Sequence, residues 1–190
     1  IEQPLEGKPS YGLTDEEVLG FCALLLVAGY ETTTNLLGNS AVVLAQHRQA
    51  RRRLAADRTL LGPAGGHLLR CRSPAQGLSP TLTRDVILHD TTMRHGEKVL
   101  LLFGSANRDE RAFPDPDVFD IERTSEHQVA FGRGIHFCLG AALARMEARI
   151  ALNALLDKVP DWDVDLESAR RLRSGPIRGY TSLPITWATG

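Results

Sequence analysis

Lysine and cysteine are both scarce in this chain of 190 residues. The 22 basic residues include only three lysines, Lys8, Lys98 and Lys158. We interpret this arginine bias as a sign of GC-rich coding and not as a property of the fold. There are three cysteines: Cys22, Cys71 and Cys138. Their odd number and wide spacing do not fit a disulfide framework. The sequence therefore favours a reducing compartment, and we expect a cytoplasmic protein.

The chain also lacks an excess of charge and a long apolar run. Its net charge of -1 and its pI of about 6.7 give no reason to expect nucleic acid as a partner. We expect the basic run 51–53 to form a solvated helix face. The longest apolar run, residues 21–30, has about half of the roughly 20 residues that a membrane span needs. Because the chain begins at Ile1 and not at methionine, we expect that an N-terminal part, with any anchor on it, precedes it.

The first half of the chain predicts a linker followed by helices. Residues 1–12 are rich in proline and glycine and indicate a linker. Thr14 and Glu17 have the spacing of a capping box, and from there to about residue 46 we predict one helix of about 30 residues that crosses the core. A second helix is expected over 47–56, whereas glycines and prolines break up residues 61–80.

The second half predicts strands, an irregular stretch and one more long helix. Strand-like segments at 83–88 and 98–103 are expected to pair through a turn at His95 and Gly96. Residues 107–123 show no clean period, and a glycine-rich loop then leads into a helix of about 18 residues. Apolar positions of that helix recur on one face: Leu139, Leu143, Met146 and Ile150. With short strands after residue 160, the fold class is mainly α with a small β part.

Residues 131–140, Phe-Gly-Arg-Gly-Ile-His-Phe-Cys-Leu-Gly, are the segment with the clearest chemistry. Three glycines allow a tight turn and the close approach of a flat ligand. Cys138 is expected at the start of the following helix, whose positive end favours a thiolate, and a thiolate in such a loop is a soft ligand for iron. His136 is placed to donate a hydrogen bond to an anionic group of a cofactor.

Other interpretations of this loop remain. A cysteine at a helix start is often only a small buried hydrophobic residue. Zinc needs four ligands at short spacings, and Cys138 has only His136 nearby. A dinucleotide-binding loop would need a glycine where Phe137 stands. A cysteine hydrolase that uses Cys138 with a remote histidine is a further alternative.

The ten residues resemble the haem-binding signature of cytochrome P450 enzymes, F-G-x-G-x-H-x-C-x-G in the bacterial form, and meet every fixed position. The resemblance implies that Cys138 is the proximal iron ligand and that His136 contacts a haem propionate. It also implies that three other residues shape the loop, namely Phe131, Gly132 and Gly140. The cofactor it implies is haem b, with thiolate ligation.

Residues 28–33, Ala-Gly-Tyr-Glu-Thr-Thr, resemble the oxygen-binding motif of the same family. Gly29 would leave space over the iron, and the Thr32 hydroxyl can bond the carbonyl of Ala28, four residues back. A hydroxyl beside a carboxylate gives a proton relay in which Glu31 is the reservoir. The competing interpretation is a helix kink with a solvated Glu31.

The resemblance begins at about residue 13 and continues to the chain's end, as the C-terminal part of the family fold. Arg123 fits the structural arginine of the family's meander, and Arg133, Arg145 and Arg149 either form a docking patch for an acidic electron donor or are solvated surface.

Four departures from the family pattern accompany this resemblance. The family's E-x-x-R motif reads His67-Leu68-Leu69-Arg70, Pro80 replaces an arginine that the family uses on a propionate, and residues 94–96 replace a P-x-G turn. Glycines at 65 and 66 weaken the helix. These departures are clustered, and a local reading-frame error or a decayed gene is one explanation of them.

The function implied is the insertion of one oxygen atom of O2 into a small organic substrate. Electrons would come from NAD(P)H through a ferredoxin-type or flavin partner. The alternative is a non-catalytic or decayed fragment of such an enzyme that binds haem weakly at most.

Overall fold

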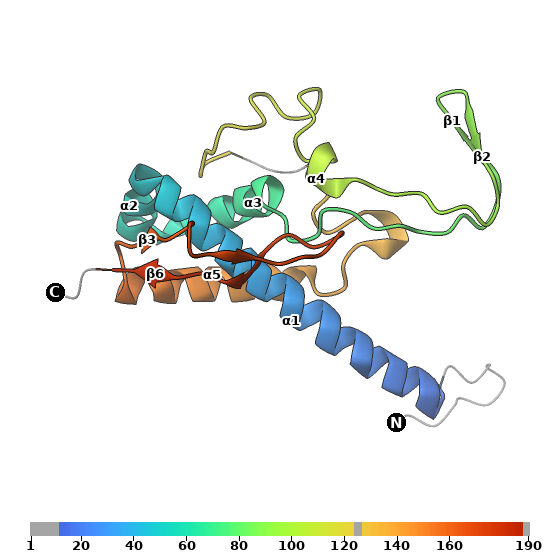
Figure 1. Ribbon diagram of the computed structural model, residues 1–190, viewed down its shortest axis with the longest axis horizontal. Helices are drawn as coiled ribbons and strands as arrows, with labels where there is room; N and C mark the ends of the chain where they lie inside the picture. The colour runs from blue at the N-terminus through green and yellow to red at the C-terminus, as the bar shows by residue number, and fades with distance from the viewer. Residues whose placement is uncertain (1–11, 124–126, 188–190) are drawn as a thin grey trace.

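The computed structural model describes residues 12–123 and 127–187 of the chain, so the predicted linker, apart from Gly12, lies outside the described residues. One long helix, α1 (Asp15–Gln46), dominates the shape of the molecule (Figure 1). The predicted capping box is present: the Glu17 amide donates to the Thr14 hydroxyl, and the Thr14 amide donates to the Glu17 carboxylate at 2.8 Å. The prediction of a single long helix is confirmed.

The main core lies at the C-terminal end of α1. There α1 packs with α2 (Arg48–Ala56), α3 (Leu61–Cys71) and α5 (Ala141–Lys158). Apolar side chains from all four helices meet Ile121 and Trp162 in one cluster, in which Leu44 and Leu54 are fully buried. Trp162 donates from its indole nitrogen to the carbonyl of Ala41, which fixes the C-terminal segment against α1. The fold is helical with a small strand part, as the sequence predicts.

Most of α1 outside this core is exposed. Buried positions begin only at Asn35, and every residue from Thr14 to Tyr30 is exposed. The prediction that α1 crosses the core is therefore wrong for its first half, which extends away from the packed helices (Figure 1). In the described part of the chain, no helix has both the length and the apolarity needed to cross a membrane.

The helix α3 forms despite three glycines and a proline, so the prediction that residues 61–80 are broken up is wrong for residues 61–71. Pro63 lies in the first turn, where an amide has no acceptor within the helix and its absence costs little. Burial of Leu61, Ala64 and Leu68 in the core stabilises the helix against the low propensity of its glycines.

The predicted pairing of the middle strands is also wrong. The hairpin consists of β1 (Val86–Leu88) and β2 (Thr91–Met93), in antiparallel register, and it turns at His89 and Asp90. Both turn residues have positive φ, 45° and 61°, as a two-residue hairpin turn requires. Residues 98–101 pair instead with 78–81 through isolated bridges. The alternation of apolar residues indicated strands but not their partners.

The rest of the chain is made of short elements. The helix α4 (Phe103–Ala106) precedes an irregular stretch, as expected for 107–123. A 3-10 turn, η1 (Arg58–Leu60), joins α2 to α3, and η2 (Gly134–His136) lies in the glycine-rich loop. After α5, β3 (Asp163–Val164) pairs with β6 (Ile185–Thr186), and β4 (Arg170–Arg171) pairs with β5 (Tyr180–Ser182), both antiparallel.

The basic run 51–53 is not uniformly solvated. Arg51 is fully buried, where it lies 4.4 Å from the centre of the Trp162 ring, donates to the Trp162 carbonyl at 2.6 Å and pairs with Asp161. Arg52 and Arg53 are exposed, as predicted. Burial and the like charge of Arg48 lower the pKa of Arg51, yet its carbonyl, carboxylate and aromatic partners hold the charged side chain in place.

Candidate functional site

The loop 131–140 is held in a tight conformation by its own backbone. The Cys138 amide donates to the Phe131 carbonyl at 2.9 Å, and the Phe137 amide donates to the Gly134 carbonyl at 3.0 Å. Gly132 and Gly134 both have positive φ, 69° and 65°. A Cβ on Gly132 would also come within 3.3 Å of the His136 carbonyl. Both the positive φ and the nearby His136 carbonyl therefore favour glycine at position 132.

The cysteine of this loop is exposed and precedes α5. Gly140 is the N-cap residue, and the Ala141 amide donates to the Cys138 carbonyl at 3.2 Å. Cys138 thus lies two residues before the cap, slightly earlier than the predicted helix start, and the N-terminal end of α5 with its positive dipole follows it closely. A Cβ on Gly140 would lie 4.0 Å from Sγ, so the space beside the sulfur stays open. His136 is exposed as well.

The motif at 28–33 has the hydrogen bond that the sequence predicts. The Thr32 hydroxyl donates to the Ala28 carbonyl at 2.7 Å, while the helix continues through the motif. Gly29 has open space where a Cβ would be, since no heavy atom comes within 4 Å of that position. Glu31 and Thr32 are half-buried. The motif therefore presents a hydroxyl and a carboxylate beside an open helix surface.

A small apolar cluster ties the two motifs together. It joins Leu36 of α1, Leu69 of α3 and Ala148 of α5 to Ala130, and Phe131 packs against it. Thr32 lies one helical turn, about 6 Å along the axis, before Leu36. The structure thus places the beginning of the cysteine loop beside α1 just after its threonine.

The residues present fit a thiolate-ligated haem. The donor set is a single exposed sulfur in a loop of glycines, and three exposed apolar residues lie near it in the chain: Ile135, Phe137 and Leu139. An apolar surface beside a soft sulfur ligand suits a flat macrocycle better than a hydrated cation. In the described part of the chain, no hydrogen bond joins Cys138 to a histidine.

The apolar stripe predicted on the last long helix is real but does not face the core. Leu143, Met146 and Ile150 are exposed, as is Leu139 before the helix, whereas Ala141, Ala148, Leu152 and Leu156 form the buried face. Exposed apolar side chains therefore line α5 next to the cysteine loop, and others lie along the first half of α1.

The three arginines predicted as a docking patch are all exposed. Arg145 lies over the Phe131 ring, with its guanidinium carbon 4.6 Å from the ring centre, which holds one positive charge against the cysteine loop. Arg133 lies in the loop and Arg149 lies one turn further along α5.

The helix α3 places a buried histidine where the family has glutamate. His67 and Arg70 are both fully buried. The backbone amide of Asp120 donates to His67 Nε2 at 3.3 Å, so this nitrogen is the acceptor and the ring is neutral. Burial, followed by the charges of Arg70 and Arg123, lowers the pKa of His67 to about 4.

The two arginines of this network bond to carbonyl groups instead of a carboxylate. Arg70 donates to the carbonyls of Asn107 at 2.7 Å and Pro116 at 2.9 Å. Arg123 donates to the carbonyls of Pro114 and Asp115, which supports its predicted structural role. Backbone carbonyl groups therefore hold both arginines in place, although the neutral His67 provides no negative charge to pair with them.

Cys71 lies in this cluster and is not a second reactive thiol. Its sulfur lies 3.1 Å from His67 Nε2 and 3.2 Å from the Arg70 guanidinium, and it is buried. Burial raises the pKa of the Cys71 thiol despite the nearby arginines. A reactive cysteine needs a lowered thiol pKa and a sulfur that is accessible to solvent, and Cys71 has neither.

Sequence reasoning missed the buried asparagines that organise the site. Asn107 accepts the Val129 amide at 2.7 Å with its side chain while its carbonyl accepts Arg70, so it links α3 to the start of the cysteine loop. Asn39 and Asn35 of α1 hold the C-terminal strands in a similar way. Their places on the buried face of a helix were the available signal, since a buried amide must find partners.

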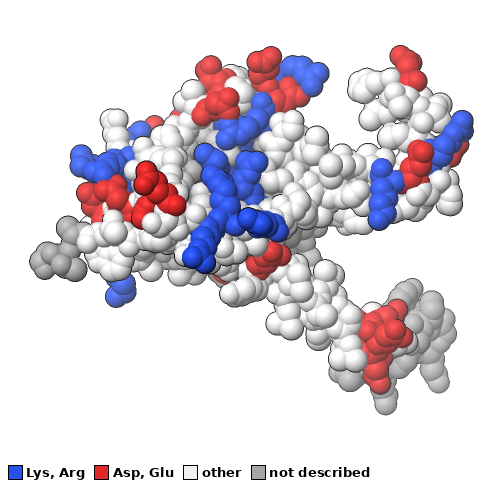
Figure 2. Space-filling view, in the orientation of Figure 1, with Lys and Arg blue, Asp and Glu red and all other residues white. Residues whose placement is uncertain are grey.

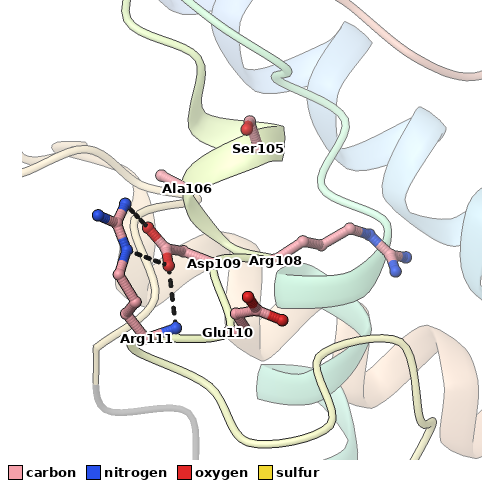
Figure 3. Close-up of a pocket in the computed structure, with 6 residues that line it drawn as sticks. All are labelled: Ser105, Ala106, Arg108, Asp109, Glu110 and Arg111. Carbon is pink, nitrogen blue, oxygen red and sulfur yellow. Dashed lines mark hydrogen bonds and ion pairs between the residues drawn. The ribbon is translucent and has the colours of Figure 1, made fainter.

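An open hollow of about 540 Å³ follows α4, and it is lined mostly by polar residues, two of which, Asp109 and Arg111, pair with each other. Figure 3 shows Arg111 clasping Asp109 with both its side chain and its amide. These bonds lower the pKa of Asp109 to about 2. Arg108 points away from them, toward α3, where it donates to the Cys71 carbonyl at 2.9 Å. The pairing of Arg111 with Asp109 thus stabilises the turn that follows α4.

Comparisons with known proteins agree with the motifs. A sequence model of the Cytochrome P450 family matches residues 68–162. The chain is 42% identical, over 98% of its length and 47% of the relative's, to a biotin biosynthesis cytochrome P450 of Bacillus subtilis. It is 42% identical, over 94% of its length, to the cytochrome P450 monooxygenase PikC of Streptomyces venezuelae.

Solved structures give the same result. The substrate-free crystal structure of CYP109E1 from Bacillus megaterium matches 98% of this chain with a TM-score of 0.90 and 42% identity, over 48% of that chain. The chain thus spans about half the length of the relatives it matches. With the family signature, the family match and this shared fold in agreement, the chain belongs to the cytochrome P450 family.

Proposed function

We propose that this chain supplies the haem-thiolate and oxygen-activating machinery of a bacterial-type monooxygenase. The observation that carries the proposal is the pairing of an exposed cysteine in a glycine-built loop with a threonine motif anchored beside it. Residues 13–190 would form the C-terminal part of the family's domain. The reaction would insert one oxygen atom of O2 into a small organic substrate, with electrons from NAD(P)H.

In this proposal Cys138 binds the iron through Sγ, and His136 donates a hydrogen bond to a propionate. Phe131, Gly132 and Gly140 shape the loop so that the flat cofactor can lie against it. Bound haem supplies the chemistry of dioxygen activation. The helix dipole of α5 stabilises the negative charge on the sulfur, because the helix begins three residues after the cysteine.

On α1, Thr32 and Glu31 would take part in proton delivery to dioxygen. The Thr32 hydroxyl donates its only hydrogen to the Ala28 carbonyl, so its oxygen is free to accept a hydrogen bond and to hold a proton donor or a water molecule in place beside the helix. Glu31 is half-buried on the same turn and can exchange protons with water. The open space at Gly29 leaves room for O2 and substrate next to this relay.

The electron donor would dock near the cysteine loop. Arg133, Arg145 and Arg149 place positive charge there, and the ferredoxin-type or flavin proteins that serve this family present acidic surfaces. Neutralising these arginines should slow electron transfer more at low than at high salt, because screening weakens the attraction.

The second candidate is a fragment without sustained catalysis. It is favoured by the exposed apolar side chains along α1 and around the loop, among them Leu26 at 74% and Ile135 at 97% exposure. A haem held on one open face would be solvated and prone to loss. We infer that turnover requires a further protein segment over this face, which would also carry substrate specificity.

Haem titration with a turnover assay distinguishes the two candidates. The chain alone should bind haem weakly and give no sustained product with electron donors present. Sustained hydroxylation of any substrate by the chain alone would show that no further segment is needed. Absence of any haem binding would contradict the proposed site itself.

A further inference from the structure

An open pocket lies where two backbone segments, 72–76 and 171–179, meet. Its volume is about 530 Å³, which is within the range of small-molecule sites. No residue of the cysteine loop lines it. Three of its lining residues are arginines from different parts of the chain, namely Arg72, Arg171 and Arg178. Figure 2 shows basic side chains gathered in this part of the surface, where the C-terminal strands cross α1 in Figure 1.

The positive charges of this pocket are not neutralised by the described part of the protein. In residues 12–123 and 127–187, none of the three arginines makes an ion pair with a carboxylate. A fourth, Arg108, pairs with Asp117. Partial desolvation, followed by the charges of Arg72, Arg171 and Arg108, lowers the pKa of Arg178. The three guanidinium groups therefore repel one another unless an anion joins them.

Two buried asparagines of α1 hold the backbone beneath these arginines. Asn39 is 4% exposed, and its side chain donates to the carbonyls of both Arg72 and Arg178, at 3.3 and 3.0 Å. The Arg178 amide also donates to the Pro74 carbonyl at 2.8 Å. The positions of Arg72 and Arg178 are therefore fixed relative to each other.

The third arginine is held by the neighbouring strands. Arg171 of β4 pairs with Tyr180 of β5, and its guanidinium lies over the Tyr180 ring, 5.2 Å from the ring centre. Asn35 accepts the Tyr180 amide at 3.2 Å. A guanidinium stacked on a ring keeps the donors on its edge free. The close approach here excludes a side chain at Gly179, because a Cβ there would overlap Asn35.

We propose that Arg72, Arg171 and Arg178 form a binding site for a small ligand that carries a phosphate or diphosphate group. A single carboxylate satisfies one guanidinium, whereas a phosphate offers oxygens in several directions and two negative charges. Ile177 and Leu172 provide apolar contacts for the remainder of such a ligand. The site is separate from the proposed haem site and uses none of its residues.

Calorimetric titration of the full chain with inorganic pyrophosphate at low ionic strength tests the proposal. Wild-type protein should bind one pyrophosphate. The double variant Arg171→Gln, Arg178→Gln should bind at least about tenfold more weakly, since it loses two guanidinium groups that donate charge-assisted hydrogen bonds to the anion. Arg178→Lys keeps the charge but loses the forked donor, and should lie between the two. Both positions are exposed, so the variants should remain folded by circular dichroism.

Arg52→Gln is the matched control, because Arg52 is an exposed arginine on α2 outside this pocket. It should leave pyrophosphate binding unchanged. Succinate, a dicarboxylate, should bind more weakly than pyrophosphate. Absence of pyrophosphate binding, or equal binding by the double variant, would overturn the proposal. Arginine-dependent binding of an oligoglutamate peptide without binding of pyrophosphate would also overturn it, and would identify a protein-docking surface instead.

Discussion

Replacement of His67 by glutamine should remove one specific part of the pH dependence of stability. The imidazole has a pKa near 6.5 when the chain is unfolded and about 4 in the folded protein. Between these values the unfolded chain takes up a proton that the folded protein does not. The free energy of unfolding therefore falls as the pH is lowered from about 6.5 to 4, and the contribution is fully present above pH 6.5.

The size of this effect follows from the shift in pKa. A difference of one pKa unit corresponds to 1.36 kcal/mol, so the His67 shift amounts to about 3 kcal/mol over the whole interval. Glutamine keeps a neutral hydrogen-bond acceptor for the Asp120 amide but does not titrate. His67→Gln should thus flatten the stability profile between pH 4 and 6.5 by about that amount.

Urea unfolding at several pH values measures this difference between wild type and variant. Carboxyl groups with lowered pKa, such as that of Asp109, affect both proteins alike and cancel in the comparison. A His67→Gln profile that keeps the wild-type slope would refute the conclusion that His67 is buried in its neutral form.

His67→Glu extends the same test to the arginine network. A carboxylate here would meet the charges of Arg70 and Arg123, which already act on His67. We expect a gain of up to about 3 kcal/mol at pH 7, below the full value of a buried pair because carbonyl groups already accept hydrogen bonds from both arginines. Its stability should be lost only as the pH falls below about 4, the reference range of a carboxyl group.

Three further results are expected. When a segment covers the haem face, Thr32→Ala should keep O2 consumption but divert it to peroxide, and an unchanged ratio of product to O2 would remove Thr32 from the mechanism. His67→Glu combined with Pro80→Arg should raise soluble yield and haem retention, measured by the haem content of purified protein, without giving turnover by the chain alone; equal haem content would show that these departures are harmless. Leu44→Ala should lower the free energy of unfolding by about 2–5 kcal/mol, because Leu44 is fully buried in the main core. Leu26→Ala, at an exposed position, should change it by less than about 0.5 kcal/mol. Equal effects of the two substitutions would show that Leu44 does not lie in the core.

The sequence predicted those features that depend on local chemistry. The capping box at Thr14, the bond from Thr32 to Ala28 and the loop before α5 each involve residues within a few positions of one another. Such contacts form from local geometry alone, so their spacing in the sequence is sufficient to identify them.

Errors arose where distant packing decides the outcome. Glycine and proline predicted a break at 61–80, but burial of Leu61 and Leu68 holds α3 in a helix. Residues 98–101 pair with 78–81 and not with the predicted strand, because register depends on partners that alternation does not specify. Arg51 is buried by the ring of Trp162, which lies more than a hundred residues away in the sequence.

The apolar stripe of α5 shows a third kind of limit. Periodicity correctly put Leu143, Met146 and Ile150 on one face, yet this face is exposed and a different set, which includes Leu152 and Leu156, is buried. The helix α5 has two apolar faces: one packs in the core, and the other is exposed, on what we propose to be the haem side. Periodicity identifies such faces but not what covers them.

The ferrous-carbonyl absorption spectrum of the haem-bound chain tests most directly whether Cys138 ligates haem iron through its sulfur, as we propose. Wild type, Cys22→Ser and Cys71→Ala should all show the red-shifted Soret band of thiolate ligation, because Cys22 lies on the exposed part of α1 and Cys71 lies in the buried α3 cluster. Cys138→Ala should lose this band. A histidine-like band in the wild type, or a Cys138→Ala spectrum identical to that of the wild type, would contradict the account.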